Sequence, residues 1–269
     1  MTNLTDRDSH FEFGSNWQAY SKTIDGARIQ SAVDGMRKLF PDGLSGKTFL
    51  DIGCGSGLHS LAALLLGASS VRATDIDENS VSAARTVLST HFPKGGWSVE
   101  QVSVFDMTPD GIGAFDIVYS WGVLHHTGDM WRSIETASNL VKPGGQFAIA
   151  IYAKTAMDTP WKIEKRFYKN APKVIQWAMR QSFTAALVAA KIARGKNPIS
   201  IFRDPLTRGM NMSHDLHDWM GGYPYETATA EELDTRITAM GFILIRSFPI
   251  AGKLGLFGSG CHELVFRRF

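Results

Sequence analysis

A run of alternating glycines at the end of an apolar segment constrains the fold of this chain most. Residues 48–61 read TFLDIGCGSGLHSL, so Gly53, Gly55 and Gly57 follow a strand-like pattern and precede a helix-like one. Glycine adopts backbone angles that other residues avoid, and without a side chain it lets a ligand approach the main chain. The stretch predicts a strand, a turn and a helix, with either a nucleotide-type ligand at the turn or a purely structural turn.

Short apolar runs and helical patterns alternate along much of the chain. Strands are expected near 48–52, 70–75, 98–104, 115–120 and 146–152, and again near 242–248 and 262–269. Helices are expected near 58–67, 78–91 and 129–141, and KPGG at 142–145 is expected to close a helix and turn into the fifth strand. Such alternation predicts an α/β fold, in which a parallel sheet carries helices on both faces.

Two common phosphate-binding motifs do not fit the residues around the glycines. The dinucleotide fingerprint requires glycine at position 58, where this chain has Leu58. The Gly-Lys-Ser/Thr sequence of a triphosphate-binding loop is absent. A Rossmann oxidoreductase is therefore disfavoured, and the turn allows close approach of a ligand without the surroundings expected for a pyrophosphate.

Acidic residues stand at the ends of three successive predicted strands. Asp51 ends the first strand, Asp75 ends the second, and Asp106 follows the third beside Phe105. Open α/β sheets bind ligands in the crevice at the carboxyl ends of their strands. Carboxylates there suit an ammonium group, a ribose or an exocyclic amine, and they repel phosphate.

At this point the chain resembles the class I S-adenosylmethionine-dependent methyltransferases. The resemblance rests on LDIGCGSG, the acid at position 75, SVFD, FDIVYSWGVLHH and LVKPGGQFAIAIY, which span most of residues 48–152 in the same order. It implies a Rossmann-like, seven-stranded, mostly parallel sheet whose last strand is antiparallel, and S-adenosylmethionine as cofactor. The cofactor-binding residues implied in this region are Asp51, Gly53, Gly55, Gly57, Asp75, Ile76, Phe105, Asp106 and Trp121.

The resemblance also implies a role for several of these residues. Asp51 and the backbone of Gly53 and Gly55 would hold the methionine part of the cofactor. Asp75 would bind the ribose hydroxyls, Ile76 would pack on the adenine ring, and Asp106 would accept from the adenine amine. The helix beginning at Leu58 would direct its positive end at the cofactor carboxylate.

Histidines in two places are candidate catalytic residues. His125 and His126 follow the fourth strand, and an imidazole can deprotonate a hydroxyl or ammonium nucleophile. His214 and His217 lie in RGMNMSHDLHDWMGGYPYE at 208–226, at helical spacing with Asp218. Both pairs have a structural alternative, as backbone-bonding or capping residues, and no metal site is predicted, although ligation by the 214–218 cluster stays open.

The N-terminal stretch HFEFGSNWQAYSK places Phe13, Trp17 and Tyr20 before the sheet region. In methyltransferases of this kind such a segment often folds over the cofactor, and aromatic rings there would face the sulfonium. Packing of an ordinary first helix is the alternative. We assign 1–45 to a helical lid, 46–153 to the cofactor-binding core, 154–222 to a helical basic cap and 223–269 to the rest of the core sheet.

The cap segment carries most of the positive charge. From Lys154 to Arg208 there are 12 Lys and Arg against 3 Asp and Glu, while the remainder has 16 basic and 23 acidic residues. Such a basic, aromatic-rich insertion suits an acceptor that is anionic or lipid-linked, with peripheral membrane contact as one option. Solvated helix faces are the alternative. A nucleic-acid partner is not expected, since no recognition motif is visible.

Together these features predict a methyltransferase that transfers a methyl group to a small molecule, with oxygen as the expected acceptor atom. RNA or protein methylation and non-catalytic S-adenosylmethionine binding are the alternatives. A nitrogen methyltransferase commonly has an Asn/Asp-Pro-Pro-Tyr-like motif where this chain has YSWG. Two cysteines and an N-terminus without an apolar signal region predict the cytoplasm. The acceptor's identity and the oligomeric state are not readable from the sequence.

Overall fold

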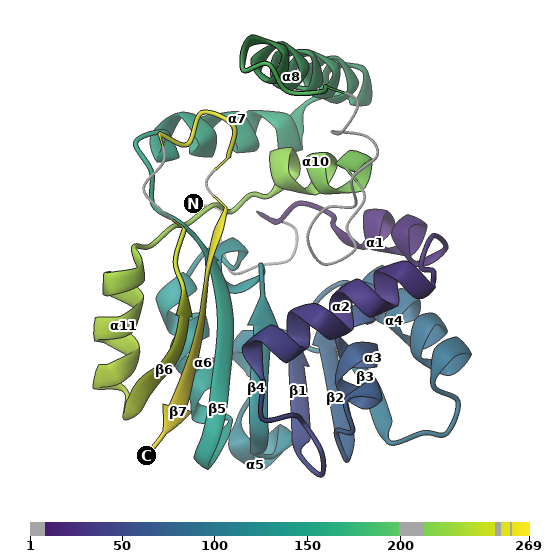
Figure 1. The fold of residues 1–269 in the computed structure, drawn as a ribbon, viewed down its shortest axis with the longest axis vertical. Coiled ribbons are helices and arrows are strands. Elements are labelled where there is room, and N and C mark those ends of the chain that lie inside the picture. Colours follow the sequence, from purple (N-terminus) through teal and green to yellow (C-terminus); the bar gives the residue numbers. More distant parts are fainter. Residues whose placement is uncertain (1–8, 199–211, 251–253, 259) are drawn as a thin grey trace.

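A seven-stranded sheet forms the centre of the chain (Figure 1). The computed structural model describes residues 9–198, 212–250, 254–258 and 260–269. The strands follow the order β3-β2-β1-β4-β5-β7-β6, and β7 is antiparallel to both of its neighbours, while β1 to β5 are parallel. Their bounds are β1 Thr48–Ile52, β2 Ser70–Asp75, β3 Trp97–Gln101, β4 Phe115–Trp121, β5 Val141–Tyr152, β6 Phe242–Phe248 and β7 Cys261–Arg268. The predicted fold class is confirmed.

Helices cover both faces of this sheet and also lie over the carboxyl ends of its strands. The N-terminal and core helices are α1 Gly14–Ser21, α2 Gly26–Leu39, α3 Leu58–Leu65, α4 Glu78–His91, α5 Pro109–Ile112 and α6 Met130–Asn139. Short 3₁₀ turns occur at η2 Val104–Asp106 and η3 Leu124–His126. The later helices are α7 Asp158–Asn170, α8 Lys173–Ala193, α10 Met212–Gly221 and α11 Ala230–Ala239.

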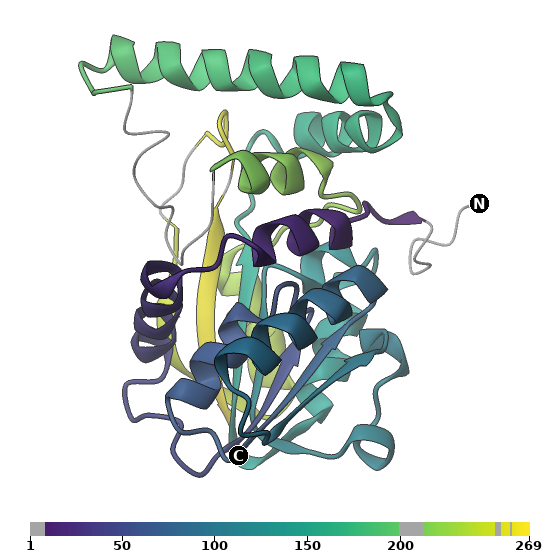
Figure 2. The ribbon, with the colours of Figure 1, turned by 90° about the vertical axis from the view of Figure 1, so that its right-hand side faces the viewer.

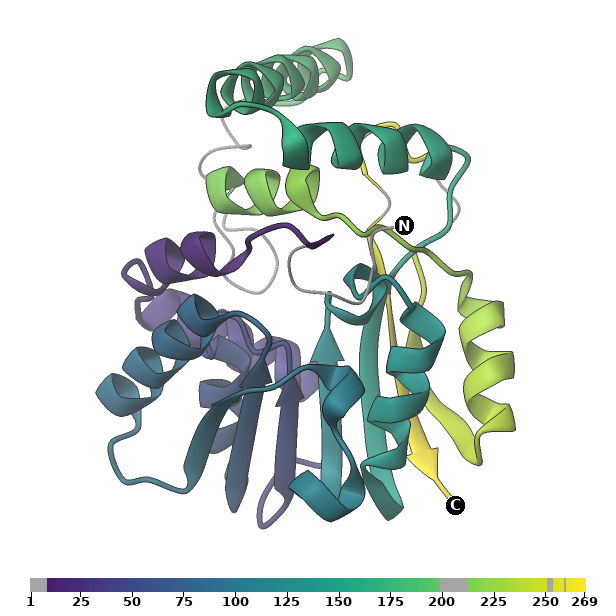
Figure 3. The ribbon, with the colours of Figure 1, turned by 180° about the vertical axis from the view of Figure 1, so that it is seen from behind.

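The core consists of one apolar layer on each face of the sheet. On β1, Phe49 belongs to the layer beneath α2, α3 and α4, and its neighbour Leu50 belongs to the layer beneath α6 and α11. This follows from the strand geometry, since successive side chains point to opposite faces. Figure 3 shows α6 and α11 on the face that is turned away in Figure 1.

The N-terminal segment is divided between two parts of the molecule. Ala32, Val33, Met36 and Leu39 of α2 are buried in the core layer, so α2 is a core helix. The stretch from residue 9 through α1 instead lies over the carboxyl ends of the strands (Figure 2). The lid role of residues 1–45 stays a prediction, and within the described chain only this first stretch lies over the carboxyl ends of the strands.

Two boundaries differ from the sequence-based expectation. KPGG at 142–145 lies inside β5, because Val141 pairs with Phe115 while Gln146 already pairs with Ile117, which leaves a bulge between them. Gly144 supplies the positive φ of 73° that the bulge requires. The third strand ends at Gln101 rather than 104, since the Ser103 hydroxyl accepts the Phe105 N–H and caps a 3₁₀ turn.

Between β5 and β6 the chain forms a helical layer above the sheet. α7 and α10 lie over the carboxyl ends of the strands, and α8 lies outermost (Figures 1 and 2). A third apolar cluster of Phe11, Tyr168, Leu216 and Met220 joins this layer to the N-terminal stretch. The helix α11 begins with a capping box of Thr229 and Glu232, which the sequence TAEELDTRITAMGF predicts. Among the described helices, none has the length and apolar character that crossing a bilayer requires.

Candidate active site

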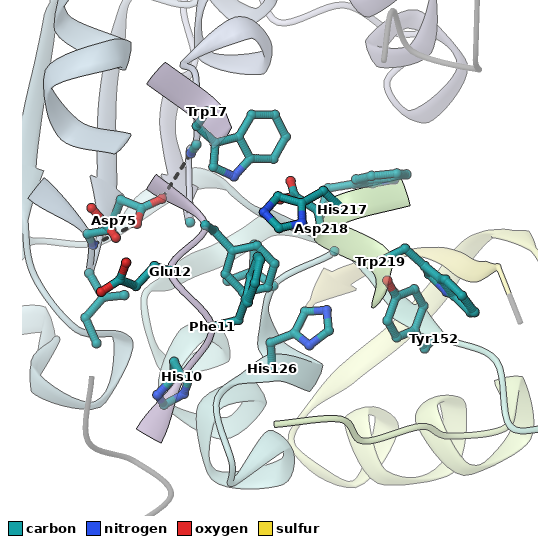
Figure 4. Close-up of a pocket in the computed structure, with 18 of the residues that line it drawn as sticks. His10, Phe11, Glu12, Trp17, Asp75, His126, Tyr152, His217, Asp218 and Trp219 are labelled. Atoms are coloured by element: carbon teal, nitrogen blue, oxygen red, sulfur yellow. Dashed lines mark hydrogen bonds between the residues drawn. The ribbon is translucent and has the colours of Figure 1, made fainter. Parts of the chain in front are cut away.

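A cavity of about 1450 Å³ separates the sheet from the helical layer. Its floor is the carboxyl edge of β1, β2 and β4, where the strand order reverses, which is the usual ligand position in such sheets. Its roof is formed by the N-terminal stretch with α1, by α10, and by parts of α7 and α8. Figure 4 shows Asp75 and Trp17 on one side of the site and His126, Tyr152 and Trp219 on the other.

The glycine turn after β1 brings the backbone to the cavity wall. Gly53, Gly55 and Gly57 have φ angles of 73°, 52° and 77°. A Cβ on Gly53 would lie 2.5 Å from Val123, and one on Gly55 would lie 2.9 Å from Trp17. Gly53 and Gly55 line the cavity, whereas Gly57 caps α3 behind it. Glycine is therefore required here both for the dihedral angle and for space.

Asp75 presents a carboxylate beside this turn. It accepts the Gly55 N–H at 3.0 Å on one oxygen and the Asp77 N–H at 2.9 Å on the other. Burial raises its pKa from 3.8 to about 6, against the opposing effect of these hydrogen bonds. A carboxylate held in this way can accept further hydrogen bonds from ligand hydroxyls. Ile76 lines the cavity next to it.

The other two predicted carboxylates do not line the cavity. Asp51 is 2% exposed and accepts the Ser60 hydroxyl at 2.6 Å behind the turn. Burial is the main cause that raises the pKa of Asp51 to about 7. Asp106 is exposed at the end of η2, and Ser103, Val104 and Phe105 line the cavity in that region. Direct cofactor contacts of Asp51 and Asp106 stay predictions.

The predicted aromatic residues of the N-terminal stretch all line the cavity. Trp17 packs on Gly55, Phe13 lies 5.5 Å from the His126 ring, and Tyr20 is almost fully buried beside Trp17. Burial raises the pKa of Tyr20 to about 12. Trp121, at the end of β4, also lines the cavity and donates to Glu263.

The two loop histidines have different surroundings. His126 lines the cavity, and its Nδ1 lies 2.7 Å from the Pro224 carbonyl oxygen. A carbonyl oxygen only accepts, so Nδ1 carries the proton and Nε2 has the lone pair. Burial lowers the pKa of His126 to about 3, which keeps the ring neutral.

His125 is fully buried and lies outside the cavity lining. Its ring packs 4.0 Å from that of Tyr152, and within the described chain neither ring nitrogen has a hydrogen-bond partner. Burial also holds its pKa well below the usual value. The geometry thus favours His126 over His125 for contact with a ligand.

His217, on α10, belongs to a hydrogen-bonded group with α7 and α8. Its Nδ1 lies 2.7 Å from the Tyr168 hydroxyl and 3.1 Å from Arg180 Nη1. Arginine is always a donor, so Nδ1 accepts and the ring proton lies on Nε2. The ring lines the cavity, as does Asp218, which accepts the Asn16 amide at 2.7 Å. The side chains of His214 and Asp215 lie outside the described residues.

Several residues of the site were not among the residues predicted to bind the cofactor or to act in catalysis. Phe11 packs its ring edge-on against His217 at 5.1 Å, and Tyr152 and Trp219 line the same side of the cavity. Lys165 is fully buried, with its ammonium against the Trp219 carbonyl and ring. Burial lowers the pKa of Lys165 to about 7. These residues reach the site through contacts between segments that lie far apart in the sequence. The sequence shows only that the N-terminal stretch and the region after residue 152 are rich in aromatic residues.

Comparison with known families identifies the sheet and its surroundings. A family model described as a methyltransferase domain matches residues 44–204, more than half of the chain. The ubiquinone biosynthesis O-methyltransferase of Pseudomonas paraeruginosa is 39% identical over 106 residues, which are 39% of this chain and 44% of that protein. The protein of the same name from Caulobacter vibrioides is 27% identical over 182 residues, covering 63% of this chain and 68% of that protein. The aligned part thus spans less than half the length of the Pseudomonas relative.

Solved structures show the same fold at lower identity. Magnesium protoporphyrin IX methyltransferase from Synechocystis, with bound SAH, aligns with a TM-score of 0.55 at 17% identity and covers 90% of this chain and 83% of its own. An S-adenosylmethionine-dependent methyltransferase from Mesorhizobium loti aligns with a TM-score of 0.52 at 17% identity and covers 87% and 96%. At these identities the likeness concerns the fold.

Proposed function

The chain belongs to the class I S-adenosylmethionine-dependent methyltransferases, and from this premise we propose that it methylates a hydroxyl oxygen of a small molecule. The curated relatives in the comparison are named as O-methyltransferases, which supports oxygen as the methylated atom. The observation that carries the proposal is His126, which lines the same cavity as the glycine turn and keeps its Nε2 lone pair.

The residues around the glycine turn fit the cofactor. Val123 and Trp17 pack directly on Gly53 and Gly55, at the positions that a side chain would occupy. The turn therefore has bare backbone groups at the cavity wall, where a cofactor can contact them. Asp75 would accept from the ribose hydroxyls, with Ile76 and Phe105 beside the adenine. Bound S-adenosylmethionine supplies a methyl group on a sulfonium, already activated for transfer to a lone pair. The protein's task is then to align the acceptor and exclude water.

His126 would receive the proton of the acceptor hydroxyl at Nε2. The hydrogen bond from Nδ1 to the Pro224 carbonyl fixes the ring and its tautomer. A pKa of about 3 makes the free ring a weak base, but an oxygen that gains a methyl group becomes far more acidic than the original hydroxyl. Proton transfer late in the reaction is therefore sufficient. His217, whose Nδ1 is bonded by Tyr168 and Arg180, would orient the acceptor rather than abstract its proton.

The lining of the second half of the cavity indicates the acceptor class. Phe11, Tyr152, Phe183 and Trp219 offer an apolar and aromatic surface, and Lys169 and Lys173 contribute positive charge. We propose an acceptor with an apolar body and a negative group, which includes lipid-linked molecules. Residues 154–222 would form its cap, as their sequence suggested. Cys54 and Cys261 are not joined by a disulfide bond, which agrees with the proposed cytoplasmic location.

The function can be tested with His126→Gln and labelled S-adenosylmethionine. The wild-type protein should transfer label to an extractable small molecule, and the variant should lower kcat by about 10²–10⁴-fold, the usual range for a lost proton acceptor. Calorimetry should show cofactor affinity within about twofold of wild type, because His126 lies outside the glycine turn.

Three outcomes would contradict this proposal. Label recovered only in RNA or protein would reject a small molecule as the acceptor. Cofactor binding without any methyl transfer would favour a non-catalytic binding protein. Equal losses of kcat and cofactor affinity in His126→Gln would count against a proton-accepting role. His125→Asn serves as the neighbouring comparison, in which folding stability should change more than turnover.

A further inference from the structure

The outermost helix, α8, has an apolar outer side. Val174, Trp177 and Ile192 are 75%, 57% and 59% exposed and recur at helical spacing, with Ala185 and Val188 between them. The opposite side of the helix faces inward, because Gln176, Phe183 and Leu187 line the cavity. An outer helix of a soluble protein normally turns its polar side outward, so this outward apolar stripe needs a partner.

The helix α7, which lies next to α8 in Figures 1 and 2, carries further exposed apolar side chains. Ile163 and Phe167, one turn apart, are 67% and 59% exposed, and Ile175 in the first turn of α8 is 42% exposed. Together these two helices hold six of the eleven large exposed hydrophobic side chains in the described residues. We call these six residues the apolar patch. Concentration of exposed apolar side chains in one place marks an interaction site rather than chance exposure.

Positive charge surrounds this patch. Residues 159–198 contain nine Lys and Arg and a single acidic residue, Glu164. Both carboxyl oxygens of Glu164 are buried, so they do not balance the charge at the surface. Exposed basic side chains lie on both helices, at Lys162, Arg166 and Lys173, and just after the end of α8, at Arg194 and Lys196.

We propose that this surface of α7 and α8 docks on an anionic lipid bilayer. An apolar stripe flanked by basic residues is the pattern of a helix that lies in the bilayer interface. Trp177 would sit at the headgroup level, and the exposed lysines and arginines would contact lipid phosphates. Figure 2 shows α8 at the top of the molecule, remote from the sheet, where it can meet a flat surface without obstruction.

A second copy of the chain fits this surface less well. In a twofold pair the same patch meets itself, so the basic residues of one copy would face those of the other without acidic partners. An anionic bilayer supplies the missing negative charge. Lys169 and Lys173, at the junction of α7 and α8, line the cavity, so docking would bring the bilayer close to the site proposed for an apolar acceptor.

Vesicle co-sedimentation of the full chain, without cofactor, tests the proposal. We expect binding to vesicles of phosphatidylcholine mixed with phosphatidylglycerol to exceed binding to phosphatidylcholine alone by about tenfold or more, and to weaken at high salt. The double variant Val174→Ser, Trp177→Ser should lose most of this binding. Neutralising Lys173, Arg194 and Lys196 with Gln should remove the preference for anionic vesicles.

A matched control replaces exposed apolar residues elsewhere. Leu65 on α3 and Ile243 on β6 are 49% and 50% exposed, and Leu65→Ser with Ile243→Ser should leave vesicle binding unchanged. Calorimetry with S-adenosylmethionine checks that each variant is folded. Vesicle binding is measured without methyl transfer, so its result does not depend on whether the proposed activity is correct.

Two results would overturn the proposal. One is absence of binding, or equal binding to both kinds of vesicle, by the folded wild-type chain. The other is sedimentation velocity that shows a dimer dissociated by Val174→Ser, Trp177→Ser, which would make the patch an interface between copies.

Discussion

At the scale of single residues, two adjacent histidines have separate chemical environments. His125 and His126 belong to the 3₁₀ turn η3, in which successive side chains point about 120° apart. One ring therefore enters the packed interior beside Tyr152, and the other reaches the cavity and the Pro224 carbonyl. The sequence contains both as equivalent candidates, because only the direction of the side chain distinguishes them.

Asp75→Ala should weaken S-adenosylmethionine binding by about 1–3 kcal/mol, the cost of leaving buried hydrogen-bond groups without a partner. The change removes the proposed ribose acceptor and also frees the Gly55 N–H. Isothermal titration calorimetry measures the effect directly. Asp110→Ala is the matched control, since Asp110 is exposed and lies outside the cavity lining, and the affinity of that variant should stay near wild type. Equal losses of affinity in the two variants would reject the ribose assignment.

Cofactor affinity should rise with pH between about 5 and 8. Burial raises the pKa of Asp75 to about 6 and that of Asp51 to about 7, and a cationic ligand favours their ionised forms. The unliganded protein should show the opposite trend, because each raised carboxyl pKa contributes stability that is lost as pH rises from about 4 to about 7. Titrations and denaturant unfolding across this pH range check both. Asp75→Asn should flatten the affinity profile, and an unchanged slope would reject the assignment.

At the scale of elements, the helix α1 depends on a close contact at its first residue. A Cβ on Gly14 would lie 2.2 Å from an oxygen of the Asp77 carboxyl group, so a larger residue would have to displace the side chain that caps α4. Trp17, one turn later, then packs on Gly55, and Asn16 bonds Asp218 of α10. The helix thus joins the glycine turn to the helical layer above it.

Gly14→Ala should displace α1 and lower cofactor affinity, since overpacking of this kind typically costs about 1–3 kcal/mol. Gly26→Ala provides the control, because Gly26 begins α2 and a Cβ there would meet nothing within 4 Å. That variant should keep wild-type affinity and gain up to about 1 kcal/mol of helix stability. Calorimetric titration and urea unfolding of both variants provide the comparison. Equal affinities in the two variants would mean that α1 does not close the cofactor site.

At the scale of the whole molecule, the site lies between the sheet and the helical layer above it. The sheet supplies the glycine turn and Asp75, while the helical layer supplies His217, Asp218 and Trp219. The Phe11 N–H bonds the Tyr223 carbonyl at 3.0 Å, so the N-terminal stretch is attached to the upper layer and lies across the lower one. A ligand that fills the cavity contacts both layers and should stabilise their contact.

S-adenosylmethionine should therefore slow amide hydrogen exchange in residues 10–20 and 216–223. Ligand binding shifts the equilibrium away from open states in proportion to its excess over Kd, by about 2.7 kcal/mol at a hundredfold excess. Exchange in α11 should change much less, because α11 packs against β6 on the far side of the sheet from α2 and lines no part of the cavity. Hydrogen-exchange mass spectrometry with and without the cofactor measures both regions. Protection confined to the glycine turn would separate α1 and α10 from cofactor binding.

The sequence by itself determined the sheet, its helices and the cofactor edge. Period-two and helical patterns, the glycine turn and the capping box of Thr229 and Glu232 depend on residues near each other in the chain. It also located Gly53, Gly55, Asp75, Ile76 and Trp17 at one cavity wall. These features follow from local backbone geometry, which is readable along the chain.

Only the tertiary structure decided which polar side chains face the cavity. Asp51 and His125 are buried away from it, Asp106 is exposed beside it, and His217 joins it through Tyr168 and Arg180, far away in the sequence. Only the tertiary structure showed that α2 packs in the core and that the apolar side of α8 faces outward. These outcomes depend on packing between distant segments, which fixes side-chain direction and burial, and no local pattern encodes them.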